Sequence, residues 1–80
     1  MLDYTRIFCQ NLKMLREKHS LTKKEMADIL EIGTRTLDKI ERGALPKAVT
    51  VKIIFQVQRH LGVPAKELFA PLNEKEDSSL

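Results

Sequence analysis

The chain has 80 residues, 42% hydrophobic and 31% charged, a composition typical of one globular domain and not of a disordered or membrane-spanning protein. Aromatic residues make up only 5% and Trp is absent, which argues against a single-strand binder that stacks bases on aromatic rings. The net charge of +3 is uneven, because residues 1–70 hold 13 basic and 8 acidic side chains, and it suits a polyanionic partner and an ordinary solvated surface equally well.

A first helix is expected over residues 4–19. Phe8, Leu12 and Leu15 have the spacing of one helical face. Asp3 precedes them and is a suitable N-cap residue, because its carboxylate can accept a hydrogen bond from a free backbone N–H of the first turn. The sequence therefore predicts an amphipathic helix that packs one side on a core.

A second helix is expected over residues 22–31. Thr22 and Glu25 have the spacing of a capping box, in which each side chain accepts a hydrogen bond from the other residue's backbone N–H. The apolar stripe behind it consists of Met26, Ile29 and Leu30. Gly33 follows, and we expect it to make the turn, because glycine adopts conformations that strain other residues.

A third helix is expected over residues 34–42, with Leu37 and Ile40 on its buried side. Gly43 follows the last periodic residue, where a left-handed residue commonly ends a helix. The two helices and the tight turn between them have the helix-turn-helix arrangement, in which the second helix can lie in a DNA major groove.

A fourth helix is expected over residues 47–61, ended by Gly62. It has more apolar residues than one face requires, and Ile53 and Val49 are expected to fall outside the buried stripe. Either the helix is enclosed within the bundle, or this face associates with another chain. A short fifth helix should begin at Pro64, whose missing N–H suits a first helical position, with its Leu-Phe pair packed on the core.

Several motifs occur in order over about residues 8–70, and together they resemble a known family. They are Leu15-Arg16, Leu21-Thr22, Met26-Ala27, Ile40-Glu41-Arg42-Gly43 and the later HLGVPAKELF. In this order they resemble the DNA-binding domain of the Cro and lambda-repressor-like, or XRE, family of bacterial and phage regulators. The resemblance implies an all-α, compact five-helix bundle that binds double-stranded DNA, usually as a homodimer on a two-fold-related site.

The resemblance also implies roles for particular side chains. Thr34 and Arg35 should meet base edges, with Lys39 one turn further along. Lys23 should contact a phosphate, although the family often has Gln there, and Gly33 replaces the family's usual Ser or Thr cap. Arg16 and Glu41 should form a partly buried ion pair between the first and third helices.

Arg35 has the strongest chemical case, because its guanidinium can donate two hydrogen bonds to O6 and N7 of guanine. Thr34 fits a thymine methyl, a phosphate or a substitute helix cap about equally. Asp38 would be repelled by phosphate; it could accept from a cytosine amine or, as we favour, hold Arg35 and Lys39 in place. Further phosphate contacts are predicted for Lys24, Arg42 and Lys47.

A catalytic or metal site is not expected. His19 and His60 lie far apart in sequence, and no Cys, His or carboxylate spacing suggests a ligand set, so we predict no enzyme activity, metal or cofactor. Cys9 is the single cysteine and is expected to pack as a small hydrophobe in the reducing cytoplasm. The N-terminus lacks a signal-peptide pattern, and no apolar run is long enough to span a membrane.

The sequence thus predicts a helix-turn-helix domain over residues 1–70 and a flexible acidic tail over residues 71–80. The favoured function is a cytoplasmic transcriptional regulator, of the repressor kind, without a small-molecule effector because no sensor domain is evident. The alternative is a protein-interaction module, such as the antitoxin of a toxin–antitoxin pair.

Overall fold

The computed structural model describes residues 3–71, and all regular structure in this part of the chain is helical. The elements are α1 (Tyr4–Lys18), α2 (Lys23–Leu30), α3 (Thr34–Glu41), α4 (Lys47–Leu61) and α5 (Ala65–Leu68). The predicted all-α, five-helix fold is confirmed. The predicted tail falls outside the described residues except for Pro71, so the domain boundary at residue 70 stays a prediction.

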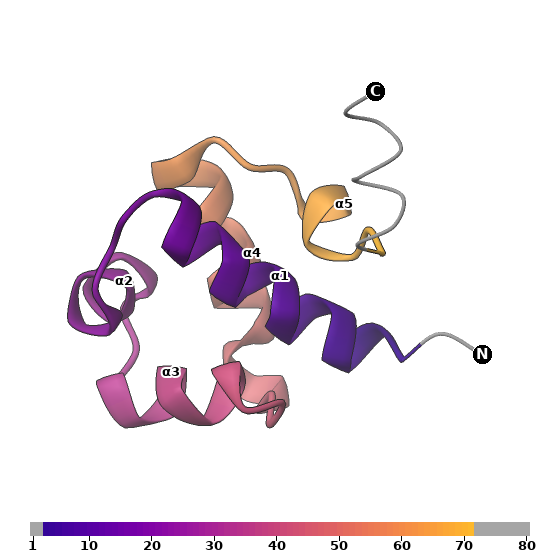
Figure 1. Cartoon of the computed structure of the whole chain (residues 1–80), viewed down its shortest axis with the longest axis horizontal. Helices are drawn as coiled ribbons and strands as arrows, with labels where there is room; N and C mark the ends of the chain where they lie inside the picture. The colour runs from indigo at the N-terminus through magenta and orange to yellow at the C-terminus, as the bar shows by residue number, and fades with distance from the viewer. Residues whose placement is uncertain (1–2, 72–80) are drawn as a thin grey trace.

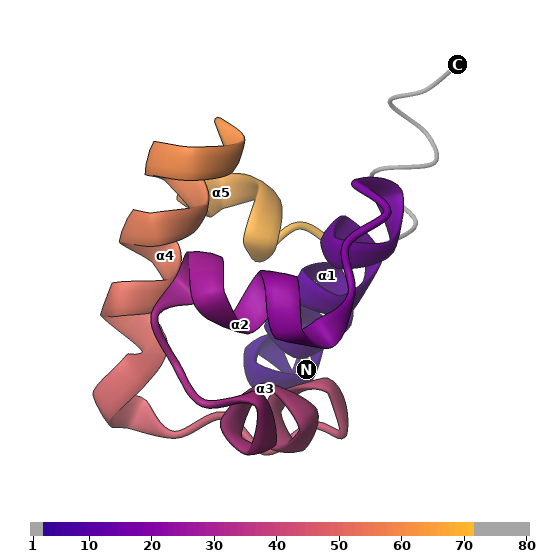
Figure 2. The same cartoon turned by 90° about the vertical axis from the view of Figure 1, so that its left-hand side faces the viewer.

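The five helices pack around one hydrophobic core. Figure 1 shows α1 crossing the middle of the molecule, with α2 and α3 on one side and α5 on the other. Seen from the side, α3 lies at one end and α5 towards the opposite end (Figure 2). The fully buried core side chains come from all five helices and include Phe8, Leu12, Met26, Leu30, Leu37, Ile40, Ile53, Val57 and Leu68.

The predicted N-terminal caps of the first two helices are confirmed. The Asp3 carboxylate accepts from the Arg6 N–H at 3.2 Å. In α2 the capping box is complete, with the Glu25 N–H donating to Thr22 Oγ1 at 3.1 Å and the Thr22 N–H to the Glu25 carboxylate at 2.8 Å. These bonds use donors that a helix start otherwise leaves free, and the hydrogen bonds from Thr22 lower the pKa of Glu25.

The turn between α2 and α3 differs from the prediction. Gly33 has φ −73°, which any residue adopts, and it serves as the N-cap of α3 without a side-chain hydrogen bond. Glu31 instead takes the left-handed conformation, with φ 58° and ψ 43°. This costs about 1–2 kcal/mol for a non-glycine residue, and it is supported by tertiary contacts that a local pattern does not reveal.

Those contacts come from α4. Gln56 is 3% exposed, and its amide donates to the Ile29 carbonyl at 3.3 Å and to the Glu31 carboxylate. Lys52 Nζ donates to the Glu31 carbonyl at 3.1 Å. Two side chains of α4 therefore satisfy polar groups at the end of α2 and hold the turn that positions α3.

The expected placement of α4 residues is also corrected. Ile53 is fully buried, whereas Val51 and Phe55 are 76% and 59% exposed. The apolar residues of α4 lie on several sides of the helix, and their periodicity therefore did not identify which side faces the core. Gly62 ends α4 in the left-handed conformation, as predicted.

The last helix begins one residue later than expected, because Pro64 is its N-cap and not its first residue. Leu68 is buried, and the Phe69 ring lies 5.2 Å from the Phe8 ring, centroid to centroid. Asn11 Nδ2 donates to the carbonyls of Leu68 and Ala70, both at 2.9 Å. These contacts fasten α5 to α1.

Candidate nucleic-acid interface

α3 has one side in the core and one side on the surface. Leu37 and Ile40 are completely buried, which fixes how the helix is rotated about its axis. Thr34, Arg35 and Lys39 lie on the opposite, exposed side. Figures 1 and 2 both place α3 at the edge of the molecule, so this side is open to a large partner.

Arg35 and Lys39 are four residues apart and therefore neighbours on the surface of α3. Within residues 3–71 neither side chain forms an ion pair or a hydrogen bond. Like charges at this spacing repel each other. The exposed side of α3 thus carries two cations whose hydrogen-bond donors are available to an anion or to base edges.

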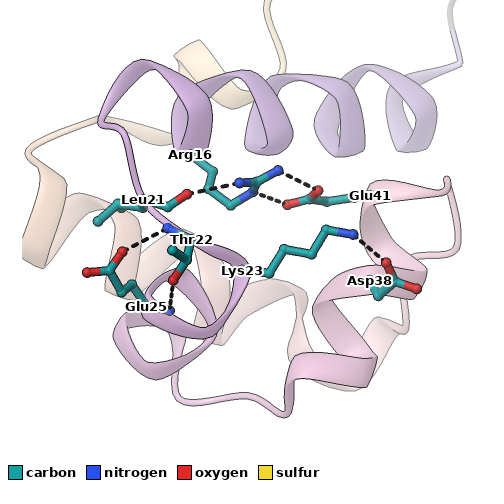
Figure 3. A network of polar contacts seen from close by, with 7 residues as sticks. All are labelled: Arg16, Leu21, Thr22, Lys23, Glu25, Asp38 and Glu41. Carbon is teal, nitrogen blue, oxygen red and sulfur yellow. Dashed lines mark hydrogen bonds and ion pairs between the residues drawn. The ribbon is translucent and has the colours of Figure 1, made fainter.

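Asp38 does not hold Arg35 and Lys39, which corrects the favoured hypothesis for this residue. Its carboxylate accepts from Lys23 Nζ of α2 at 2.6 Å (Figure 3) and pairs with Arg42 Nη2 at 3.0 Å. We call Lys23, Asp38 and Arg42 the Asp38 cluster. The hydrogen bond from Lys23 is the main reason that the pKa of Asp38 is lowered, and Arg42 lowers it further.

The structure brings Arg16 of α1 and Glu41 of α3 together. Arg16 Nε donates to Glu41 Oε2 at 2.7 Å and Nη2 to Oε1 at 3.2 Å, a two-pronged arrangement (Figure 3). A third donor, Nη1, bonds the Leu21 carbonyl at 2.9 Å. The side chains are 14% and 4% exposed. Arg16 therefore ties together α1, α3 and the segment before α2, and its hydrogen bond to Glu41 raises its pKa.

A family model described as helix-turn-helix matches residues 12–68, which is most of the chain and covers the second half of α1 and the whole of α2 to α5. The chain belongs to the Cro/C1-type (XRE) helix-turn-helix family. Comparisons with curated proteins and with solved structures found no match.

Membership of the helix-turn-helix family makes the chain a DNA-binding regulator. This is a family of DNA-binding domains and not typically of enzymes. In the described part of the chain, no three His, Cys, Asp or Glu residues cluster closely enough to bind a metal. None of the helices described is long and apolar enough to cross a membrane.

The other predicted phosphate contacts of the helix-turn-helix domain lie on its surface. Lys24 Nζ is 3.7 Å from the Asp28 carboxylate, and both side chains are more than 70% exposed, so this pair contributes little. Lys47 is exposed at the first position of α4. Arg42, at the C-cap of α3, has a side chain that is 78% exposed.

Two buried polar residues of the helix-turn-helix domain were missed, Gln56 and Asn11. Gln56 lies directly between the core positions Ile53 and Val57, and Asn11 beside Leu12. A polar residue inside an apolar stripe is the signal that could have found both, since buried amides are almost always hydrogen-bonded. Neither lies on the exposed side of α3, but Gln56 helps to position α3 through the turn.

Proposed function

We propose that this protein is a sequence-specific transcriptional regulator that inserts α3 into the major groove of double-stranded DNA and acts as a repressor. The observation that carries the proposal is the exposed side of α3, where Arg35 and Lys39 have no partner within residues 3–71 and the opposite side is anchored in the core. A rigidly held helix with free donors on its outer side suits the groove, which is wide enough to admit it.

Base readout is assigned to Thr34, Arg35 and Lys39. Arg35 offers two parallel N–H donors to O6 and N7 of a guanine. Thr34, the first residue of the helix, offers a methyl group to thymine or a hydroxyl to phosphate. Each good two-pronged contact discriminates against a wrong base by about 1–3 kcal/mol.

Phosphate contacts are assigned to Lys23, Lys24, Arg42 and Lys47. The first two lie in the first turn of α2, where the helix dipole disfavours cations and attracts anions. A phosphate beside them turns that local cost into a gain. Such contacts position the protein on DNA and make its affinity depend on salt, but they carry no sequence information.

Repression requires only that the bound protein covers DNA that the transcription machinery needs. A homodimer is proposed because two copies can read two half-sites about 34 Å apart, one turn of the double helix. The exposed Val51 and Phe55 of α4 support a contact between copies, since exposed apolar side chains commonly mark association surfaces. We place the protein in the cytoplasm, and no small-molecule effector is proposed.

The same two α4 side chains favour a second candidate, a protein-interaction module such as an antitoxin that masks a toxin. The two candidates differ in what they require of α3. A module whose only task is to bind a protein gains nothing from Arg35, whereas a DNA regulator depends on it.

Duplex binding over a salt series tests the proposal. We expect the logarithm of the binding constant to fall linearly with the logarithm of the salt concentration, with a slope of about −0.9 for each phosphate contacted. A random 20-base-pair duplex and a duplex selected from a random pool should give similar slopes and different affinities. No binding at low salt, or binding without a salt dependence, would contradict the proposal.

A further inference from the structure

A carboxylate stands on the DNA-facing helix among residues proposed to bind phosphate. Asp38 of α3 contacts Lys23 Nζ at 2.6 Å and Arg42 Nη2 at 3.0 Å. A carboxylate presents the same negative oxygens to these cations as a phosphate does. Asp38 is therefore a competitor, built into the chain, for two of the groups that would bind the DNA backbone.

The geometry of the Asp38 cluster allows that competition. The side chains of Lys23, Arg42 and Asp38 are 44%, 78% and 31% exposed, so both cations can leave the carboxylate and reach a phosphate without disturbing the core. The Lys23–Asp38 contact joins α2 to α3 across the turn (Figure 3). One carboxylate shared by two cations leaves the cluster with a single net positive charge.

We propose that Asp38 attenuates DNA binding, because it holds Lys23 and Arg42 and so weakens binding to the phosphate backbone of any DNA. The proposal rests on the proposed function. Binding to random DNA comes essentially from phosphate contacts, whereas the correct site adds base contacts. The Asp38 carboxylate cancels one positive charge on the phosphate-binding side, so it lowers the affinity for random DNA and for the correct site by about the same factor.

Asp38→Asn tests this in the full chain, because the amide keeps the shape and removes the charge. The matched control is Glu67→Gln, which makes the same change of charge on α5, away from α3 (Figure 2). The readout is fluorescence anisotropy with a random 20-base-pair duplex and with the selected duplex, between 0.05 and about 0.5 M salt. Thermal melting by circular dichroism checks that each variant is folded.

We expect Asp38→Asn to bind the random duplex about eightfold more tightly at 0.1 M salt, with a slope steeper by about 0.9, as one further phosphate contact predicts. The selected duplex should gain affinity by a similar factor, because phosphate contacts are made in both complexes and carry no sequence information. Glu67→Gln should change neither duplex affinity by more than about twofold. Adding Lys23→Gln to Asp38→Asn removes one released cation and should return the slope towards that of the unmodified chain.

Two results would overturn the role of Asp38 while leaving the proposed function intact. One is an unmodified chain that binds duplex DNA with a salt slope and an Asp38→Asn variant that is indistinguishable from it. The other is a loss of affinity for the selected duplex alone, which would make Asp38 a base contact. If no protein binds any duplex at 0.05 M salt, both the proposed function and the role of Asp38 are wrong.

Discussion

Arg16 and Glu41 show how a single ion pair can set the position of α3, the helix proposed to meet DNA. Glu41 is the last residue of α3 and is 4% exposed, so its charge depends on the guanidinium for compensation. Breaking one partner of a buried pair leaves the other charge uncompensated, at a cost of about 3–5 kcal/mol. The surface pair Lys24–Asp28 has no such dependence.

Glu41→Ala should therefore lower the melting temperature by more than about 10 °C, since 1 kcal/mol corresponds to about 4–8 °C in a domain of this size. Asp28→Ala removes an exposed carboxylate from α2 and should lower the melting temperature only slightly. Circular dichroism on both variants decides the matter. Equal shifts for the two would show that the Arg16–Glu41 pair contributes no more than a surface pair.

Arg35 is the residue on which the proposed base readout depends most. Arg35→Ala should weaken binding to the selected duplex by about 1–3 kcal/mol and binding to a random duplex much less. Arg35→Lys should not restore selectivity, because an ammonium group cannot make the two-pronged contact. Arg59→Ala is the control, since Arg59 is an exposed arginine on α4. A uniform loss on both duplexes would instead assign Arg35 to phosphate.

The partners of Asp38 were not predictable from the sequence. Lys23 is fifteen residues away, and the pairing depends on the angle between α2 and α3. That angle is set by the left-handed conformation of Glu31 and by the long-range hydrogen bond that Gln56 donates to the Glu31 carboxylate. Neighbours on one helix could be paired from their spacing, whereas a contact across a turn requires the geometry of the turn.

At the scale of the helix, α2 depends on its first turn, because eight residues are too few for a helix to be stable in isolation. The capping box at Thr22 and Glu25 compensates in part. It was predictable, because its signal lies within four consecutive residues. The conformation of the turn was not predictable. Gly33 indicated locally that the glycine makes the turn, whereas the contacts that hold the turn come from α4.

Thr22→Ala should lower the free energy of unfolding by about 1 kcal/mol, the usual value for a lost N-cap, measured in urea.

The capping box also predicts an acid dependence. The pKa of Glu25 is lowered in the folded state, so its contribution is present above the ordinary value of 4.5 and is lost as the pH falls through the lowered pKa. Glu25→Gln should flatten the stability profile in that acidic range; an unchanged profile would contradict the role of the carboxylate.

For the whole molecule, the fold was predictable because its core positions recur at helical spacing in α1, α2 and α3. The rotation of α4 about its own axis was not predictable, because apolar residues lie on several sides of this helix. Only the packed bundle shows that Ile53 is buried and Phe55 exposed. The proposed contact between copies is placed at Val51 and Phe55 because of this correction.

Phe55→Lys should shift the monomer–dimer equilibrium towards the monomer without lowering the melting temperature, since Phe55 is 59% exposed. Val51→Lys, one turn earlier, should act in the same way. Analytical ultracentrifugation measures the equilibrium, and Gln10→Lys, at an exposed position of α1, controls for added charge. An equilibrium unchanged by Phe55→Lys would exclude this face as the contact between copies.

The exposed side of α3 is the surface that we propose to meet DNA. Titration of the isotopically labelled protein with the selected duplex, followed by amide chemical shifts, tests this most directly. We predict the largest changes in α3 around Thr34, Arg35 and Lys39 and in the first turn of α2, with α5 unchanged. Changes confined to α4 around Val51 and Phe55, with α3 unaffected, would contradict it.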